Sequence, residues 1–371
     1  MRIAYDYQAF TLQSYGGISR YFACLAQGLM NLQHQVKIIA PLHRNSYLGL
    51  LPPGIVDGRG ITKFPPKTAR LFIAYNYLAT RLKIAQWQPD VVHETYYSRV
   101  GSAPKNCPTV ITVYDMIHEL YRNEFPAHDN TSALKIKAIQ RADHVICISE
   151  NTKQDLMRLH GTDANKISVV HLGFTKFGDK GKISPPAELN RKPFILYVGN
   201  REGYKNFSGL IKAVALSKKL VNDFDIIAFG GGQLTSAESS LIQSSGFAPE
   251  QVRQVSGDDI LLGQYYEAAR AFVYPSLYEG FGIPPLEAMA HRCPVISSNT
   301  SSMPEVIGNA AEFFDPSQAQ SVCLAIENVV YSDARSAELR HLGHHRLKAF
   351  TWKKCTAQTL VVYRAVLGQS K

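Results

Sequence analysis

The feature that most constrains this chain is a repeated alternation of short apolar segments with longer amphipathic ones. In the first half, residues 2–7, 36–40, 90–93, 109–115 and 144–149 have the composition of buried strands. Amphipathic helices are expected between and after them, at residues 18–32, 130–142 and 149–161. Strand–helix alternation predicts a parallel sheet that is covered by helices on both faces.

The alternation stops over residues 173–193, which are rich in Gly, Pro and Lys and read as a linker. It restarts with expected strands at 194–199, 225–232, 252–257, 271–276 and 294–298. A last amphipathic helix is expected over 350–367. We therefore predict an α/β chain with two doubly wound, Rossmann-like domains facing a central cleft, at 1–172 and 194–350. Ligands of such sheets bind beyond the carboxyl ends of the strands.

Size and composition agree with two domains of a cytoplasmic protein. The length of 371 residues exceeds one comfortable core. No apolar run approaches the roughly 18 residues of a membrane-spanning helix, and the start of the chain reads as a strand, without the apolar stretch of a signal peptide. The six cysteines form no Cys-x-x-Cys pair, which indicates reduced thiols.

The positive charge is unevenly distributed along the chain. The net charge is +10, and residues 1–172 hold 19 Lys and Arg against 12 Asp and Glu, a net charge of +7. A basic first half indicates an anionic partner, such as a membrane surface, a lipid-linked phosphate or nucleic acid. An ordinary solvated surface is the alternative.

The most informative short segment runs from Glu279 to Glu287 and contains Gly280, Gly282 and a Pro-Pro step. Prolines suit the first turn of a helix, so we expect Glu279 in a loop and Glu287 in the opening turn of the next helix. Glycines allow a ligand to approach the backbone, and helix-start amides favour an anion. A phosphate cradle between two carboxylates fits a nucleotide sugar. Ordinary loop punctuation is the competing interpretation.

Other polar groups follow the expected strands. Gly16 and Gly17 come after the first strand, while His93-Glu94 and the pair Asp115 and His118 come after later ones. In the second half, Arg201 and Lys205 follow one strand and Gly230-Gly231-Gly232 the next. An Arg and a Lys at a cleft can neutralise a diphosphate.

Several segments together resemble one enzyme family. Residues 268–316 are similar to the C-terminal half of the retaining glycosyltransferases of family 4, which have the GT-B fold. Residues 16–29, 112–126, 142–161, 166–174 and 197–214 resemble the same family in the expected order. The most similar branch contains mannosyltransferase-B-like enzymes that build bacterial surface polysaccharides.

The resemblance implies residue roles. It makes 1–172 the acceptor domain, with helix 351–371 packed back onto it, and 194–350 the donor domain. Glu287 would hold the donor ribose, and Glu279 the transferred sugar. Lys205 and Arg201 would bind the diphosphate. The remaining donor-binding positions are Gly16, Gly17, Gly232, Val255, Ser256, Phe281, Gly282 and Ile283.

The acceptor side contains departures from the family. Asp115 and His118 are expected to face the transferred sugar and the acceptor, and with Glu279, Lys205 and Arg201 they form the predicted catalytic set. Tyr114 stands where many members have His, so which of Tyr114, Asp115 and His118 contacts the sugar is open. Arg292 stands where relatives often have Gly.

The resemblance also implies the chemistry. A hexose would pass from a nucleotide diphosphate sugar, GDP-mannose being favoured, to a growing and lipid-linked bacterial polysaccharide, with retention at the anomeric carbon. We expect no cofactor and no metal, so we interpret Asp223-Phe224-Asp225 and the histidines of 341–345 as structural.

Residues 63–83 combine basic side chains with aromatic and aliphatic ones, which is typical of a helix in a lipid interface. A core-packed helix is the alternative. The expected location is therefore the cytoplasm, with contact to the inner face of the plasma membrane. Competing functions are the same transfer from a UDP-sugar, and a non-enzymatic protein that binds anions or nucleic acid, although the chain contains no recognised nucleic-acid reader motif.

Overall fold

The computed structural model describes residues 1–61, 65, 68–176 and 192–368 of the chain. Lys63, Phe64 and Lys67 of the expected interfacial helix, and most of the expected linker, lie outside the described residues. The chain divides into two compact units, Met1–Gly173 with Thr351–Lys371, and Phe174–Phe350. All six cysteines are free.

Unit 1 is built on a parallel sheet with the strand order β3-β2-β1-β4-β5-β6-β7. Its strands are β1 (Arg2–Tyr5), β2 (Gln35–His43), β3 (Val56–Gly60), β4 (Val91–Glu94), β5 (Thr109–Val113), β6 (His144–Cys147) and β7 (Ile167–Val169). Its α-helices are α1 (Gln8–Leu12), α2 (Gly17–Asn31), α3 (Ala69–Trp87), α4 (Ile117–Leu120), α5 (Thr131–Arg141), α6 (Glu150–His160) and α15 (Trp352–Val366). Short 3₁₀ turns are η1 (Tyr47–Leu50), η2 (Arg122–Glu124) and η3 (Ala164–Lys166).

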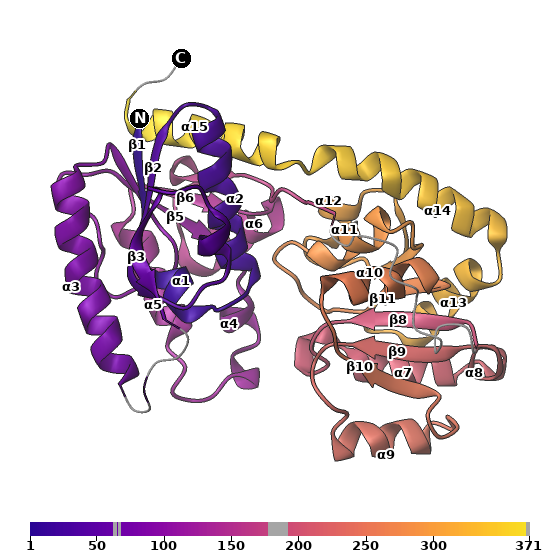
Figure 1. Cartoon of the computed structure of the whole chain (residues 1–371). Coiled ribbons are helices and arrows are strands. Elements are labelled where there is room, and N and C mark those ends of the chain that lie inside the picture. The colour runs from indigo at the N-terminus through magenta and orange to yellow at the C-terminus, as the bar shows by residue number, and fades with distance from the viewer. Residues whose placement is uncertain (62–64, 66–67, 177–191, 369–371) are drawn as a thin grey trace. The chain divides into compact units, whose positions relative to one another are not determined.

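The two faces of this sheet are covered by different helices (Figure 1). Alternate residues of a strand point to opposite faces. On β1, Ala4 packs in a cluster with Ile84 of α3, whereas Tyr5 contacts Phe22 of α2 and Tyr363 of α15. Helix α15, which ends the described chain, therefore completes the core of the unit that contains the first strand.

Unit 2 repeats the architecture with the strand order β10-β9-β8-β11-β12-β13, again all parallel. Its strands are β8 (Phe194–Val198), β9 (Asp225–Phe229), β10 (Val252–Val255), β11 (Ala271–Tyr274), β12 (Val295–Ser298) and β13 (Ala311–Phe314). Its helices and turns are η5 (Gly203–Lys205), α7 (Phe207–Ala215), α8 (Lys218–Asp223), α9 (Ser236–Ser244), α10 (Asp259–Ala268), α11 (Ile283–Ala290), α12 (Met303–Ile307), α13 (Ala319–Val330), α14 (Asp333–Arg346) and η6 (Leu347–Ala349).

These sheets confirm the predicted fold class of two doubly wound α/β domains. In each sheet the strand order reverses at one point, between β1 and β4 in unit 1 and between β8 and β11 in unit 2. Loops that leave neighbouring strands in opposite directions open a crevice at such a point, and doubly wound folds bind ligands there. The loops after β8 and β11 are therefore the first place to look for a site.

Candidate functional site

The switch point of unit 2 brings two predicted residues into contact. Lys205 follows β8 and Glu279 follows β11, and these strands are neighbours in the sheet. The Nζ atom of Lys205 lies 2.7 Å from Oε1 of Glu279. The backbones meet as well, because Leu277 N donates a hydrogen bond to Tyr204 O at 2.7 Å. The sequence thus identified both members of an ion pair at the expected place.

Aromatic side chains surround the Lys205 ammonium group. It lies 5.3 Å from the ring centre of Tyr204 and 6.0 Å from that of Tyr274. The Lys205 side chain is 21% exposed, and that of Glu279 is 10% exposed. The pair is thus largely shielded from water, where an electrostatic interaction is stronger than on an open surface.

Hydroxyl groups hold the loop that follows Glu279. Ser301 Oγ accepts a hydrogen bond from the Glu279 amide at 2.9 Å. Ser302 Oγ is shared between the carbonyl oxygens of Glu279 and Phe281, at 2.8 and 3.1 Å. Gly282 has φ of +94°, and a Cβ there would lie 2.6 Å from Met303 Cε. The positive φ favours glycine, and the turn that Gly282 makes starts α11 at Ile283.

The predicted position of Glu287 in the opening turn is wrong. Helix α11 begins at Ile283, one residue before the two prolines, so Glu287 is its fifth residue and lies in the second turn. Its carboxylate accepts a hydrogen bond from the Tyr266 hydroxyl, with 3.3 Å between Oη and Oε2. Burial, with Glu287 beside it, raises the pKa of Tyr266 well above its ordinary value, so this hydroxyl stays protonated and donates.

The Arg201 side chain is hydrogen-bonded to the glycine loop that follows β9. Its guanidinium group pairs with Glu238 at 2.7 Å and donates to the carbonyl oxygens of Gly230 and Gln233, at 2.9 and 2.8 Å. Glu238 also closes a capping box with Thr235 at the start of α9. Arg201 is itself buried. These contacts give Arg201 a positioning role, while its predicted contact with a diphosphate stays a prediction.

The glycine loop requires glycine for conformational reasons. Gly230, Gly231 and Gly232 all have positive φ values, of +91°, +70° and +71°. A Cβ on Gly231 would lie 2.8 Å from Arg201 Nη1, whereas one on Gly232 would meet nothing within 4 Å. The space beside Gly232, the residue of this loop that is predicted to bind the donor, is therefore open on the side where a Cβ would lie.

The two residues expected beside the nucleobase adjoin this loop. Val255 ends β10, and its carbonyl accepts a hydrogen bond from Gly230 N at 2.8 Å. Gln254 Nε2 donates to Ser256 Oγ at 2.7 Å and to Gly230 O at 3.2 Å. Unit 2 therefore gathers its predicted donor-binding residues around the carboxyl ends of β8, β9, β10 and β11.

In unit 1 the two predicted glycines begin α2, but they differ in surroundings. A Cβ on Gly16 would lie 2.5 Å from Gln13 Oε1, and that oxygen accepts a hydrogen bond from Ser19 N at 3.1 Å. Gln13 therefore occupies the space beside Gly16 and satisfies an amide of the first helical turn. A Cβ on Gly17 would meet nothing within 4 Å, so Gly17 has room for a ligand.

The three candidates after β5 have different environments. Tyr114 is buried, lies edge-on to Tyr21 and donates from its hydroxyl to Thr95 O at 3.4 Å. Asp115 is partly exposed and accepts a hydrogen bond from Ile117 N at 3.1 Å. The His118 ring stacks on Phe125, with 4.1 Å between ring centres. Asp115 and His118 are therefore more accessible to a sugar than Tyr114.

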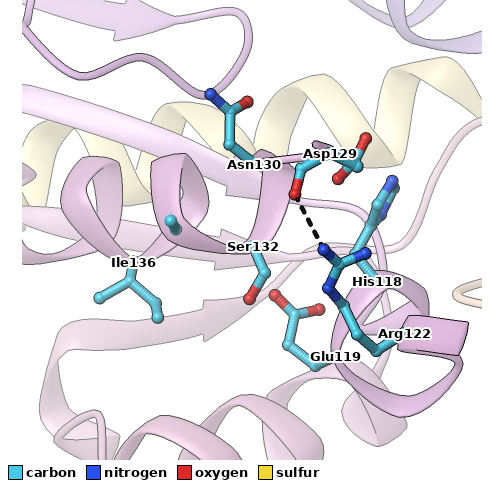
Figure 2. Close-up of a pocket in the computed structure, with 8 residues that line it drawn as sticks. His118, Glu119, Arg122, Asp129, Asn130, Ser132 and Ile136 are labelled. Carbon is cyan, nitrogen blue, oxygen red and sulfur yellow. Dashed lines mark hydrogen bonds between the residues drawn. The ribbon is translucent and has the colours of Figure 1, made fainter. Parts of the chain in front are cut away.

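His118 lines a cavity of about 420 Å³ between α4 and α5 (Figure 2). Arg122 lies at its edge and donates to carbonyl oxygens of residues 125–129, which holds that loop in place. At the base of the segment, the buried Lys135 donates to Asp115 O at 2.8 Å and to Glu119 Oε2 at 2.7 Å. Lys135 thus fixes the backbone that carries Asp115 and His118, and nothing in the sequence pattern had singled it out.

His93 and Glu94 stand at the carboxyl end of a strand, as expected, but they are the last two residues of β4 and do not follow it, and both side chains are buried. His93 bonds to Tyr363 Oη at 2.6 Å and to Thr112 Oγ1 at 2.8 Å. Glu94 pairs with Arg141 and accepts from Ser102 N at 2.9 Å.

Sequence reasoning also missed Asp6, directly after β1. Its carboxylate accepts from Thr95 N at 2.9 Å, Gln8 Nε2 at 2.7 Å and Ser102 Oγ at 3.0 Å. Asp6 could have been found from the sequence, because it is an acidic residue directly after a strand expected to be buried. These bonds satisfy a fully buried carboxylate at the switch point of unit 1.

The residues that superficially resemble metal ligands have structural partners. Asp223 Oδ2 accepts from the Tyr331 hydroxyl at 2.9 Å, and Asp225 pairs with Arg253 at 3.2 Å. His341 and His345 lie on α14 with ring centres 4.5 Å apart. Among the described residues, no three His, Cys, Asp or Glu side chains gather as a candidate metal site. That no metal is needed stays a prediction.

Comparison with known proteins places this site in a family. Residues 15–175 match the model of glycosyltransferase family 4, and residues 179–343 match that of glycosyl transferases group 1. The chain is 29% identical over 250 residues to O-antigen chain mannosyltransferase B of Escherichia coli, covering 62% of each chain. It is 27% identical over 322 residues to the O-antigen chain mannosyltransferase RfbU of Salmonella typhimurium, covering 84% of this chain and 87% of that one. Sucrose-phosphate synthase of Thermosynechococcus elongatus shares the fold over the full length of both chains, with a TM-score of 0.74 at 19% identity.

The two doubly wound, parallel α/β domains have the GT-B fold. The two family models leave only short stretches of the chain unmatched. The chain belongs to glycosyltransferase family 4.

Proposed function

We propose that this protein transfers a hexose from a nucleotide diphosphate sugar to a growing glycan. The observation that carries the proposal is the contact between Lys205 and Glu279, 2.7 Å apart at the switch point of unit 2 and on the loop that leads into α11. A cation and a carboxylate at this place suit a ligand that has a diphosphate next to a sugar.

In this proposal each of the predicted donor-binding residues binds a particular part of the nucleotide sugar. Lys205 neutralises the diphosphate, and the amides of Phe281, Gly282 and Ile283 bind its oxygens at the start of α11. Glu279 accepts hydrogen bonds from hydroxyls of the transferred sugar. Glu287, oriented by Tyr266, accepts those of the ribose. Arg201 acts mainly by holding the glycine loop against which the nucleotide lies.

The reaction proposed is a substitution at the anomeric carbon with retention. The bond from that carbon to the diphosphate oxygen breaks, and a bond to an acceptor hydroxyl forms on the same face. The departing diphosphate takes the hydroxyl proton. The main contribution of the protein is then to stabilise the charge that develops on the diphosphate, through Lys205 and oriented amides, with no metal ion. Asp115 and His118 orient the transferred sugar and the acceptor.

The relatives named above support a specific donor and acceptor. Because both are O-antigen chain mannosyltransferases, we propose mannose as the transferred sugar, GDP-mannose as the donor and a lipid-linked bacterial polysaccharide as the acceptor. Such an acceptor places the protein in the cytoplasm at the inner face of the plasma membrane. The same transfer from a UDP-sugar is the competing outcome.

Thermal unfolding with GDP-, UDP-, dTDP- and ADP-sugars tests the donor. A ligand at about 100 times its dissociation constant stabilises the folded state by about 2.7 kcal/mol, which is readily measured. We expect GDP-mannose to give the largest shift, and a similar shift when EDTA is present. No shift with any of the four would contradict a nucleotide-sugar site, and a larger shift with a UDP-sugar would replace the proposed donor. The anomeric configuration of the product, determined by NMR, tests retention.

A further inference from the structure

Helix α3 buries two polar side chains on the same side as Ile84 and exposes several large apolar ones. Asn76 and Thr80 face the sheet and are fully buried. Asn76 bonds to both backbone groups of Leu42, with Oδ1 2.8 Å from the amide and Nδ2 2.9 Å from the carbonyl oxygen. Thr80 donates to Ile39 O at 3.4 Å. The side that a surface helix usually fills with leucine thus carries amide and hydroxyl groups.

The opposite side of α3 carries large apolar side chains. Leu71, Tyr75, Leu78 and Leu82 are 71%, 54%, 61% and 65% exposed. Residues spaced by three or four positions share one face of a helix, so these four side chains form a single line, which we call the outer stripe. Figure 1 shows α3 on the outer side of unit 1, where none of the described helices and strands of this unit covers it. Apolar groups gathered in this way mark an interaction surface.

The charges of α3 all have the same sign. Residues 69–87 contain no Asp or Glu, and their charged residues are Arg70, Arg81 and Lys83. At about 100° per residue, Arg70 and Arg81 lie about 110° and about 90° to one side of the outer stripe, and Lys83 lies about 110° to the other. Lys83 is paired with Asp57, and the exposed Arg81 donates to the Tyr77 hydroxyl at 2.6 Å. Arg70 and Arg81 therefore form a cationic flank on one side of the outer stripe, whereas Asp57 neutralises the Lys83 charge on the other.

We propose that the outer stripe lies in the headgroup region of a bilayer that contains anionic lipids. Apolar side chains beside a basic flank match an acyl boundary below phosphate groups. A stable protein interface needs about 20–30 residues on each side, many more than the outer stripe supplies. None of the described helices has the length and apolar character to cross a bilayer, so α3 would lie along the surface. This inference stands on α3 alone and does not depend on the transfer reaction.

Vesicle co-sedimentation of the full chain tests the proposal. The probes are vesicles of phosphatidylcholine mixed with phosphatidylglycerol, and vesicles of phosphatidylcholine alone. We expect binding to the mixed vesicles that weakens as salt is added. The double variant Leu78→Ser/Leu82→Ser should lose at least about tenfold in partitioning. Arg70→Gln/Arg81→Gln should lose about fivefold for each arginine and show a smaller salt dependence.

A matched control separates the outer stripe from general surface hydrophobicity. Leu324 on α13 and Val361 on α15 are 49% and 63% exposed, so Leu324→Ser/Val361→Ser removes two comparable apolar groups from other helices. This control should bind vesicles as the wild type does, and every variant should keep its unfolding temperature and its shift with nucleotide sugars. Equal vesicle binding by Leu78→Ser/Leu82→Ser and wild type would overturn the proposal. The proposal would also be overturned if the wild type did not bind vesicles but self-associated in sedimentation velocity, and Leu78→Ser/Leu82→Ser abolished that self-association. If nucleotide sugars did not raise the unfolding temperature of the wild type, that result would instead refute the proposed function.

Discussion

Lys205 and Glu279 are separated by 74 positions in the chain, yet Nζ of the lysine lies 2.7 Å from Oε1 of the glutamate. They meet because β8 and β11 are adjacent parallel strands whose carboxyl ends lie at the same edge of the sheet. A diphosphate that enters this site must compete with Glu279 for the ammonium group. In the proposed function, Glu279 would hold the lysine in place before the donor arrives and would then become available to sugar hydroxyls.

Replacing the lysine should remove this charge from the transition state. We expect Lys205→Ala to lower turnover at saturating donor by about 10²-fold or more, the loss that follows removal of one charge-stabilising donor. Steady-state kinetics with the preferred nucleotide sugar measure the effect. Lys219→Ala is the control, because Lys219 is an exposed lysine of the same unit that lies over the Tyr331 ring. Turnover close to wild type in Lys205→Ala would refute the proposed role.

The Tyr266 hydroxyl should affect donor binding through Glu287. Tyr266→Phe removes the hydrogen bond that orients this carboxylate, and we expect the donor dissociation constant to rise about threefold to tenfold with a smaller change in turnover. Isothermal titration with the nucleoside diphosphate measures it. In Tyr331→Phe the same atom is removed from a tyrosine bonded to Asp223, away from the predicted donor-binding residues, and affinity should not change. Equal affinities in all three proteins would contradict the ribose assignment.

Gly231 and Gly232 allow the cost of a positive φ to be separated from the cost of a steric clash between a new Cβ and its neighbours. Gly231→Ala and Gly232→Ala both place a side chain at φ near +70°, which costs about 1–2 kcal/mol. Only the first also forces a Cβ against Arg201 Nη1 and Gly199 O. Urea unfolding should therefore show a larger loss of stability for Gly231→Ala. If Gly232→Ala is equally destabilised, the description of the Arg201 contact is incorrect.

His93 should make the protein sensitive to mild acid. Burial lowers the pKa of His93 to about 3, whereas an unfolded chain has a histidine pKa of about 6.5. The unfolded state therefore binds the extra proton between these values, and this contribution to stability is present above pH 6.5 and lost as the pH falls. From pH 6.5 to pH 5 the loss is about 1–2 kcal/mol.

The variant His93→Asn tests this contribution, because it cannot take up the proton. Urea midpoints at the two pH values should differ less in His93→Asn than in wild type, although the variant is less stable at neutral pH. His344→Gln, at an exposed position on α14, should keep the wild-type dependence. An unchanged dependence in His93→Asn would show that other groups cause it.

The sequence predicted the elements with strong apolar patterns and could not predict those without them. Strand β3 has the sequence Val-Asp-Gly-Arg-Gly and lies at the sheet edge, so only its pairing with β2 makes it a strand. The short strands β7 and β13 were missed for a similar reason. The start of α11 was misplaced because Gly282, with φ of +94°, makes the turn directly before Ile283, so the helix begins ahead of the prolines.

The candidate site shows the same division. Lys205 and Glu279 were predicted because residue type and position after a strand identify them. The partners Glu238, Tyr266 and Lys135 were not, since which side chains meet depends on the folded chain. At Arg292, where the resembling family often has Gly, the backbone has φ of +57°, a conformation that glycine adopts without strain. The sequence shows that Arg292 replaces a common Gly, but only the structure shows that this arginine adopts a positive φ, which is strained for a residue with a side chain.

Because α15 supplies Tyr363 to the interior of unit 1, the ribosome must deliver all of unit 2 and then α15 before unit 1 can close. Until then, Tyr5 and His93 lack their partner, and the surface of α2 that α15 covers stays open to water. Unit 2 contains no such late segment, so it can finish first although its residues emerge later. During biosynthesis the order in which the two units finish folding would then reverse the order in which their first residues are translated.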